Sequence, residues 1–125
     1  MKALTVKNPW AWAIINAGKD IENRSWRTLY RGPLAIHAAA SPRTDAQLPR
    51  GVPRPDPEDL VDAAILGVVD LIDVVERSKS KWFQGEFGWV LANPRRLSSP
   101  LPCKGRLGLW SLSTGQLRAV RNRLT

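Results

Sequence analysis

The stretch GKDIENR, residues 18–24, places a glycine, a lysine, an acid and an arginine within seven positions. It follows an apolar segment, residues 9–17, whose composition predicts a helix, and it opens an extended run. The glycine can end the helix in a sharp turn, because glycine adopts left-handed backbone conformations without steric cost. Lys19, Glu22 and Arg24 are then expected close together at the start of a strand. Such a cluster can bind an anion, alter the lysine pKa, or form a surface ion-pair network.

Outward from this stretch, the sequence predicts six strands and few helices. Asn8 is a favourable N-cap for the first helix, and Pro9 suits its first turn. Strands are expected at residues 3–6, 21–26, 33–39, 65–75, 87–92 and 107–112, and further short helices at about 56–64 and, capped by Thr114, at 115–124. Five prolines interrupt residues 41–57, which should form a long excursion. The pattern indicates an α+β fold, a small mixed β-barrel with helical decorations.

The composition favours a polyanionic partner. The 125 residues are expected to form one domain, 1–125, with a net charge of +8. Residues 63–125 hold ten Lys and Arg against four Asp and Glu, a balance of +6, whereas residues 1–62 hold nine against seven, a balance of +2. A basic chain of this kind suits nucleic acid, because neutralised phosphates release counterions. A solvated basic surface is the alternative interpretation.

Other classes are disfavoured. The single cysteine, Cys103, excludes an internal disulfide and a cysteine-based zinc site, and we expect neither a metal nor a cofactor. No apolar run approaches the roughly 18 residues of a membrane span, and the N-terminus lacks the apolar block of a signal peptide. The sequence therefore predicts a cytoplasmic protein without a membrane partner.

Seven segments, in their order along the chain, resemble the ASCH domain, a family of the PUA-like β-barrel superfamily. They are Pro9-Trp10-Ala11, the signature Gly18-Lys19-x-x-Glu22-x-Arg24, and residues 31–37, 67–69, 87–91, 101–102 and 105–110. The resemblance covers about residues 2–113 and leaves the last expected helix outside. It implies a barrel with the first helix at one opening. It also implies a cleft, lined by the signature residues, for RNA or a nucleotide.

The binding interpretation assigns nucleic-acid contacts to five residues: Lys19, Arg24, Trp26, Arg31 and His37. Arg24 suits a two-pronged grip on phosphate, and Trp26 suits stacking on a base. His37 is a lone histidine in an apolar strand, and a hydrogen-bonded core residue is the alternative there. A Glu22–Arg24 pair on alternate positions of one strand face, with a purely structural role, is the alternative interpretation of these two residues.

The resemblance also implies an alternative function, because family members differ in activity. Some resemble RNA-binding coregulator modules, some are ribonucleases, and some hydrolyse the amide of N(4)-acetylcytidine. This chain would then be a metal-independent hydrolase of RNA or of an acylated nucleoside. Lys19 would polarise the scissile group, and Glu22 would act as general base. The amidohydrolase branch has threonine where this chain has Glu22, so its nucleophile is missing and binding is the preferred interpretation.

Overall fold

The computed structural model describes residues 1–40 and 48–124. The elements are β1 (Lys2–Val6), α1 (Trp10–Asn16), β2 (Ile21–Arg24), β3 (Gly32–Ala38), the 3-10 turn η1 (Pro57–Asp59), β4 (Ala64–Val75), β5 (Phe87–Pro102), β6 (Leu109–Ser111) and α2 (Thr114–Arg123). None of the helices in these described ranges is long and apolar enough to cross a membrane. The excursion predicted at residues 41–57 contains no helix or strand between residue 48 and η1. Its first part, residues 41–47, lies outside the described residues.

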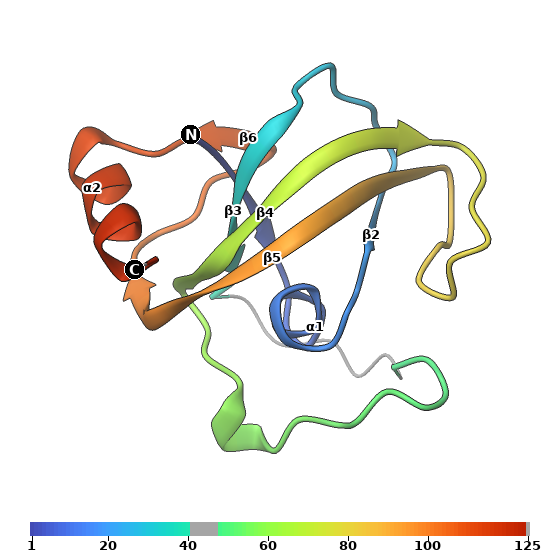
Figure 1. Cartoon of the computed structure of the whole chain (residues 1–125), viewed down its shortest axis with the longest axis horizontal. Helices are drawn as coiled ribbons and strands as arrows, with labels where there is room; N and C mark the ends of the chain where they lie inside the picture. Colours follow the sequence, from blue (N-terminus) through green and yellow to red (C-terminus); the bar gives the residue numbers. More distant parts are fainter. Residues whose placement is uncertain (41–47, 125) are drawn as a thin grey trace.

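The six strands form one mixed sheet in the order β2-β5-β4-β3-β1-β6. β1 runs parallel to β3, and all other neighbours are antiparallel. The long strands β4 and β5 cross the molecule side by side, and β2 crosses near the opposite end from β6 (Figure 1). The sheet curls into a half-barrel, so the expected small α+β barrel is confirmed.

Two apolar clusters occupy the two faces of the curled sheet. Because successive side chains of a strand point to opposite faces, neighbours such as Leu4 and Ala3 separate into different clusters. The inner cluster combines strand residues with Ala11, Ile14 and Ile15 of α1. The outer cluster packs against Val120 of α2. One helix therefore fills the half-barrel, and the other covers its outside.

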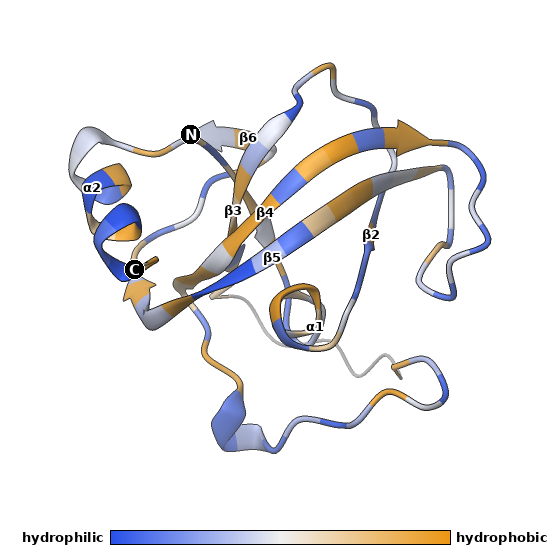
Figure 2. Cartoon of the chain, viewed as in Figure 1, coloured by the Kyte–Doolittle hydropathy of each residue, from blue (hydrophilic) through white to orange (hydrophobic). Residues whose placement is uncertain are grey.

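The predicted strands are all present, but β5 extends far beyond the expected end at residue 92. The hydrophilic residues 93–96 stand out in the middle of β5 (Figure 2), and Asn93 has a positive φ of 50°. β2 pairs with β5 only over residues 87–90. Beyond these residues β5 has no second neighbouring strand, so its prolines need not donate a backbone hydrogen bond on that side. Sheets tolerate proline at such edge positions.

Two helix predictions need correction. The helix expected at 56–64 is limited to the single turn η1, because Leu60 already has an extended backbone (φ −92°, ψ 121°). The last helix is capped by Ser113 rather than Thr114. The Ser113 hydroxyl accepts from the Gln116 N–H at 3.1 Å, and the Gln116 side chain accepts from the Ser113 N–H at 2.9 Å. This reciprocal pair is a capping box.

Candidate functional site

The turn after α1 delivers the signature residues to one place, as the sequence predicted. Gly18 adopts the left-handed conformation, with φ of 72°. The Lys19 N–H donates to the Ala13 carbonyl at 3.1 Å, so the chain folds back on the helix before β2 begins. The Asn8 side chain helps to start the helix, because its oxygen accepts from the Trp12 N–H at 3.0 Å.

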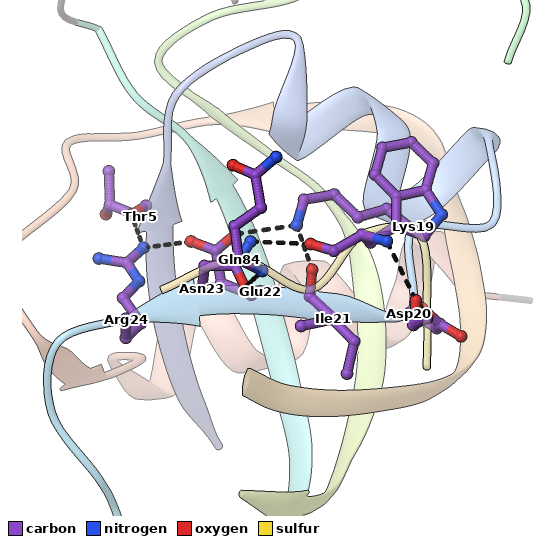
Figure 3. A network of polar contacts seen from close by, with 10 residues as sticks. Thr5, Lys19, Asp20, Ile21, Glu22, Asn23, Arg24 and Gln84 are labelled. Atoms are coloured by element: carbon purple, nitrogen blue, oxygen red, sulfur yellow. Dashed lines mark hydrogen bonds and ion pairs between the residues drawn. The ribbon is translucent and has the colours of Figure 1, made fainter. Parts of the chain in front are cut away.

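Glu22 joins two cations along β2. One carboxylate oxygen lies 3.4 Å from Lys19 Nζ, and the other lies 3.0 Å from Arg24 Nη2. Arg24 Nη2 also donates to the Thr5 carbonyl of β1 at 2.9 Å, and Lys19 Nζ donates to the Ile21 carbonyl. Figure 3 shows these contacts as a row from Thr5 through Arg24 and Glu22 to Lys19. Lys19 and Glu22 are buried, with only 4% and 8% of their surfaces exposed.

Two tryptophans enclose the lysine. The Lys19 ammonium lies 5.7 Å from the ring centroids of both Trp10 and Trp82, within the range of cation–π attraction. The two rings meet edge to face, with centroids 6.3 Å apart. Burial lowers the pKa of Lys19, and the charge and hydrogen bond of Glu22 oppose that shift. The lysine is thus buried against two aromatic rings and paired with the Glu22 carboxylate.

Two hollows flank this network. The first, which we call the seam cleft, has a volume of about 630 Å³ and lies where β2 faces the end of β1. Its lining includes Lys7, Trp10, Glu22, Arg24, His37 and Arg106. The second has a volume of about 410 Å³ and is lined by Trp10, Lys19, Glu22, Lys81, Trp82 and Gln84. Trp10 and Glu22 therefore stand between the two hollows.

His37 lies in the floor of the seam cleft and is fully hydrogen-bonded. Its Nε2 lies 2.7 Å from the Cys103 carbonyl, which can only accept, so Nε2 carries a proton. Its Nδ1 lies 3.2 Å from the Thr5 hydroxyl, which in turn accepts from Trp110 Nε1 at 3.2 Å. When the imidazole is neutral, the Thr5 hydroxyl donates to Nδ1, which completes the series of hydrogen bonds from Trp110 through Thr5 and His37 to Cys103. Only 1% of the His37 surface is exposed, which fits a core residue.

Gly105 brings the loop after β5 directly onto this floor. A Cβ atom at this position would lie 2.5 Å from Thr5 Oγ1 and 2.6 Å from His37 Nδ1. Real Cβ contacts are not that short, so the backbone approach requires glycine. The loop places Arg106, and the fully exposed Leu107, at the rim of the seam cleft.

The other two residues of the binding interpretation lie elsewhere. Trp26 packs edge to face on the core residue Trp89, with ring centroids 4.7 Å apart, and does not line the seam cleft. Arg31 lies 3.8 Å from Asp73 of β4 and donates to the Thr28 and Tyr30 carbonyls. The structure thus brings together Lys19, Glu22, Arg24 and His37, and leaves Trp26 and Arg31 apart.

Sequence reasoning missed several wall residues. Trp82 lies between two predicted strands and has no periodic neighbours that would mark it, and Trp10 was marked only as part of the Pro9-Trp10-Ala11 segment of the resemblance. Thr5 and Lys7 gave no signal, because their role depends on β1 lying opposite β2. Arg106 lies in the segment 105–110 of the resemblance, but nothing local indicated that it lines a cleft. No group of three or more histidine, cysteine, aspartate or glutamate side chains in the described ranges could hold a metal ion.

The curled mixed sheet, with one helix inside and one outside, defines an α+β protein of the PUA-like class. The ASCH domain family model matches residues 4–101, and the chain belongs to this family. The family is generally associated with RNA binding. A crystal structure of ASCH from Zymomonas mobilis matches this chain with a TM-score of 0.62 and 13% sequence identity. The alignment covers 99% of this chain and 95% of the Zymomonas mobilis chain. That similarity concerns the fold.

Two curated relatives extend the comparison. Activating signal cointegrator 1 from Homo sapiens is 31% identical over 128 aligned positions, and the Mus musculus protein of the same name is 30% identical. Each alignment covers 89% of this chain but 22% of the relative. The chain therefore spans about a fifth of the length of these relatives.

Proposed function

We propose that the protein binds single-stranded RNA, or a nucleotide, in the seam cleft. The observation that carries the proposal is the lining itself, where three cations, Lys7, Arg24 and Arg106, surround one acid, Glu22. A hollow of about 630 Å³ falls within the range of about 300–1,000 Å³ that small-molecule ligands occupy. The proposal agrees with the net charge of +8.

The three cations are suited to different tasks. Lys7 and Arg106 are exposed, and neither forms an ion pair with a described residue, so phosphates would replace only water around them. Arg24 is held by Glu22 and Thr5, and its Nε is buried without a hydrogen-bond partner among the described residues. A fixed guanidinium presents a planar, charged edge to an anion. The half-buried Trp10 supplies an aromatic surface for a base.

The test is fluorescence anisotropy of a labelled oligouridylate at several salt concentrations. If three phosphates are neutralised, log K should fall against log salt with a slope of about −2 for a single strand. The double variant Lys7→Gln/Arg106→Gln should weaken binding and reduce this slope by about 1.4. The control, Arg118→Gln/Arg121→Gln, makes the same charge change on α2 and should leave the slope nearly unchanged. Equal losses in both variants would contradict a binding site in the cleft.

A hydrolase remains the second candidate, and one observation favours it. Lys19 has a lowered pKa beside Glu22, and both line the second hollow. Perturbed lysines beside a carboxylate are typical of catalytic sites. Against this, both oxygens of Glu22 are already in ion pairs, which suits a positioning role. Incubation of the protein with RNA and with N(4)-acetylcytidine decides the matter. Turnover lost in both Lys19→Met and Glu22→Gln would support hydrolysis, and absence of turnover would leave binding as the function.

A further inference from the structure

A third hollow lies beside a different face of α1. It has a volume of about 430 Å³ and lies between α1, residues 59–61 and the second half of β5. We call it the α1–β5 groove. Its apolar lining is formed by Trp12, Val61, Leu66, Leu97 and Pro100. Trp10, which lines both hollows of the signature region, is not part of it.

One buried side chain holds two walls of this groove together. Asn8, with 1% of its surface exposed, donates to the Val61 carbonyl at 2.9 Å and to the Asp62 carboxylate at 2.8 Å. The oxygen of the same amide accepts from the Trp12 N–H. The side-chain amide of Asn8 therefore links Val61 to Trp12, and these two residues form two walls of the groove. A groove fixed in this way is preformed, which lowers the entropy cost of binding.

The Val61 wall also has an unfavourable backbone conformation. Ala63 has a φ of 55°, which residues other than glycine rarely adopt, and its carbonyl accepts from the Cys103 N–H at 3.1 Å. Val61 itself is 37% exposed. Strained backbone positions of this kind cluster at active sites and ligand-binding sites.

The charges at the rim of the α1–β5 groove favour a peptide over a nucleic acid. Arg96 is exposed and forms no ion pair with a described residue, whereas its neighbour Arg95 is paired with Asp70 at 2.6 Å. Asp59 lies on the η1 side of the groove. Its carboxylate would repel a phosphate backbone, but it is compatible with a peptide whose single acid pairs with Arg96. Apart from Trp12, the apolar lining is aliphatic, which suits an apolar side chain.

The backbone of β5 offers a further means of binding. Between Arg96 and Leu101 four β5 residues stand opposite one β4 residue, Leu66. Such a bulge takes backbone groups out of the ladder with the neighbouring strand. Extended peptides bind by hydrogen-bonding to strand groups of this kind, while pockets accept their alternate side chains.

From these observations we propose that the α1–β5 groove binds a short extended peptide of a partner protein. The peptide carries one large apolar side chain, which enters between Trp12 and Val61, and one acidic side chain, which pairs with Arg96. This surface is separate from the seam cleft, so the two proposals stand or fall independently.

The experiment selects peptides from a random eight-residue display library on the immobilised full chain. We expect enrichment of sequences that combine leucine, isoleucine or phenylalanine with a nearby aspartate or glutamate. A synthetic labelled copy of the enriched peptide should lose about tenfold or more in affinity for Arg96→Glu and for Val61→Ser. Exchange of the peptide acid for lysine should restore binding to Arg96→Glu. Arg118→Glu, the same charge change on α2, should bind like the wild type.

Four outcomes would overturn the proposal. They are the absence of enrichment, enriched peptides insensitive to both groove variants, displacement of the peptide by oligouridylate, and a dimer that Val61→Ser abolishes. Displacement would assign the groove to RNA, and the dimer would assign it to a second copy of the chain. RNA affinity measured in parallel keeps the two proposals distinguishable, because Val61→Ser should leave it unchanged while Lys7→Gln/Arg106→Gln reduces it.

Discussion

Arg24 of β2 donates to the main-chain carbonyl of Thr5 on β1 across 2.9 Å. β2 lies at one end of the sheet and β1 next to the other end, so this bond spans the opening of the half-barrel. The same guanidinium nitrogen lies 3.0 Å from Glu22, which fixes its direction. The signature arginine thus links the two sides of the seam cleft, so the binding role proposed for it cannot be separated from its structural role.

Replacement of Arg24 should therefore affect stability and RNA binding together. Arg24→Met removes a hydrogen bond from a charged donor, which contributes about 1.5–3 kcal/mol. Lysine is a poor substitute, because it lacks the planar fork that meets Glu22 and Thr5 at once. Urea unfolding and RNA anisotropy on the same samples test this. Wild-type stability and affinity in Arg24→Lys would show that a positive charge alone is sufficient.

Glu22 should be the most sensitive member of the network. Glu22→Gln leaves two cations near each other without a counter-charge, and a buried charge that loses its partner costs about 3–5 kcal/mol. Lys19→Met should cost less than half as much, since Glu22 keeps Arg24 and the methionine can pack between Trp10 and Trp82. Urea unfolding of Glu22→Gln and Lys19→Met gives the two free energies of unfolding that test this ranking. A larger loss in Lys19→Met would mean that the lysine, not the carboxylate, organises the site.

The floor of the cleft should depend on the Thr5 hydroxyl. Thr5→Val removes the group that links Trp110 Nε1 to His37 Nδ1, and a buried polar atom without a partner costs about 1–3 kcal/mol. Thr5→Ser keeps the hydroxyl and should stay within about 1 kcal/mol of the wild type. Thermal or urea unfolding of both variants provides the measurement. Similar losses in both would indicate that the threonine methyl group, rather than the hydrogen bond, matters.

The helix-to-strand turn was predictable because its determinants are local. Gly18 ends α1 and the alternation of β2 puts Glu22 and Arg24 on one face, and both features can be read from adjacent residues. The walls of the cleft depend instead on contacts between distant parts of the chain. Thr5 meets Arg24, and His37 meets Gly105, only after the sheet has curled. The length of β5 was missed for a related reason, since its prolines are tolerated where only one partner strand is present.

The loop over the cleft should not tolerate a side chain at Gly105. A methyl group there would overlap Thr5 and His37, and overpacking of this kind costs about 1–3 kcal/mol. Gly115 is the matched control, because a Cβ atom there meets nothing within 4 Å and α2 should gain up to about 1 kcal/mol from alanine. The free energy of unfolding should therefore fall in Gly105→Ala and rise in Gly115→Ala. Destabilisation in both would point to a general effect of alanine and not to the close approach.

The buried lysine should make stability depend on pH in the alkaline range. Burial lowers the pKa of Lys19 below its ordinary value of 10.5, so between the folded-state pKa and 10.5 the unfolded chain binds more protons than the folded one. The free energy of unfolding contributed by Lys19 therefore rises with pH across this window. The difference between wild type and Lys19→Met isolates that contribution, because the other titrating groups are common to both proteins. Urea unfolding at a series of pH values from neutral to 10.5 should show the difference shifting in favour of the wild type. A difference that stays constant or shifts the other way would mean that Glu22 and the two tryptophan rings fully offset the burial of the charge.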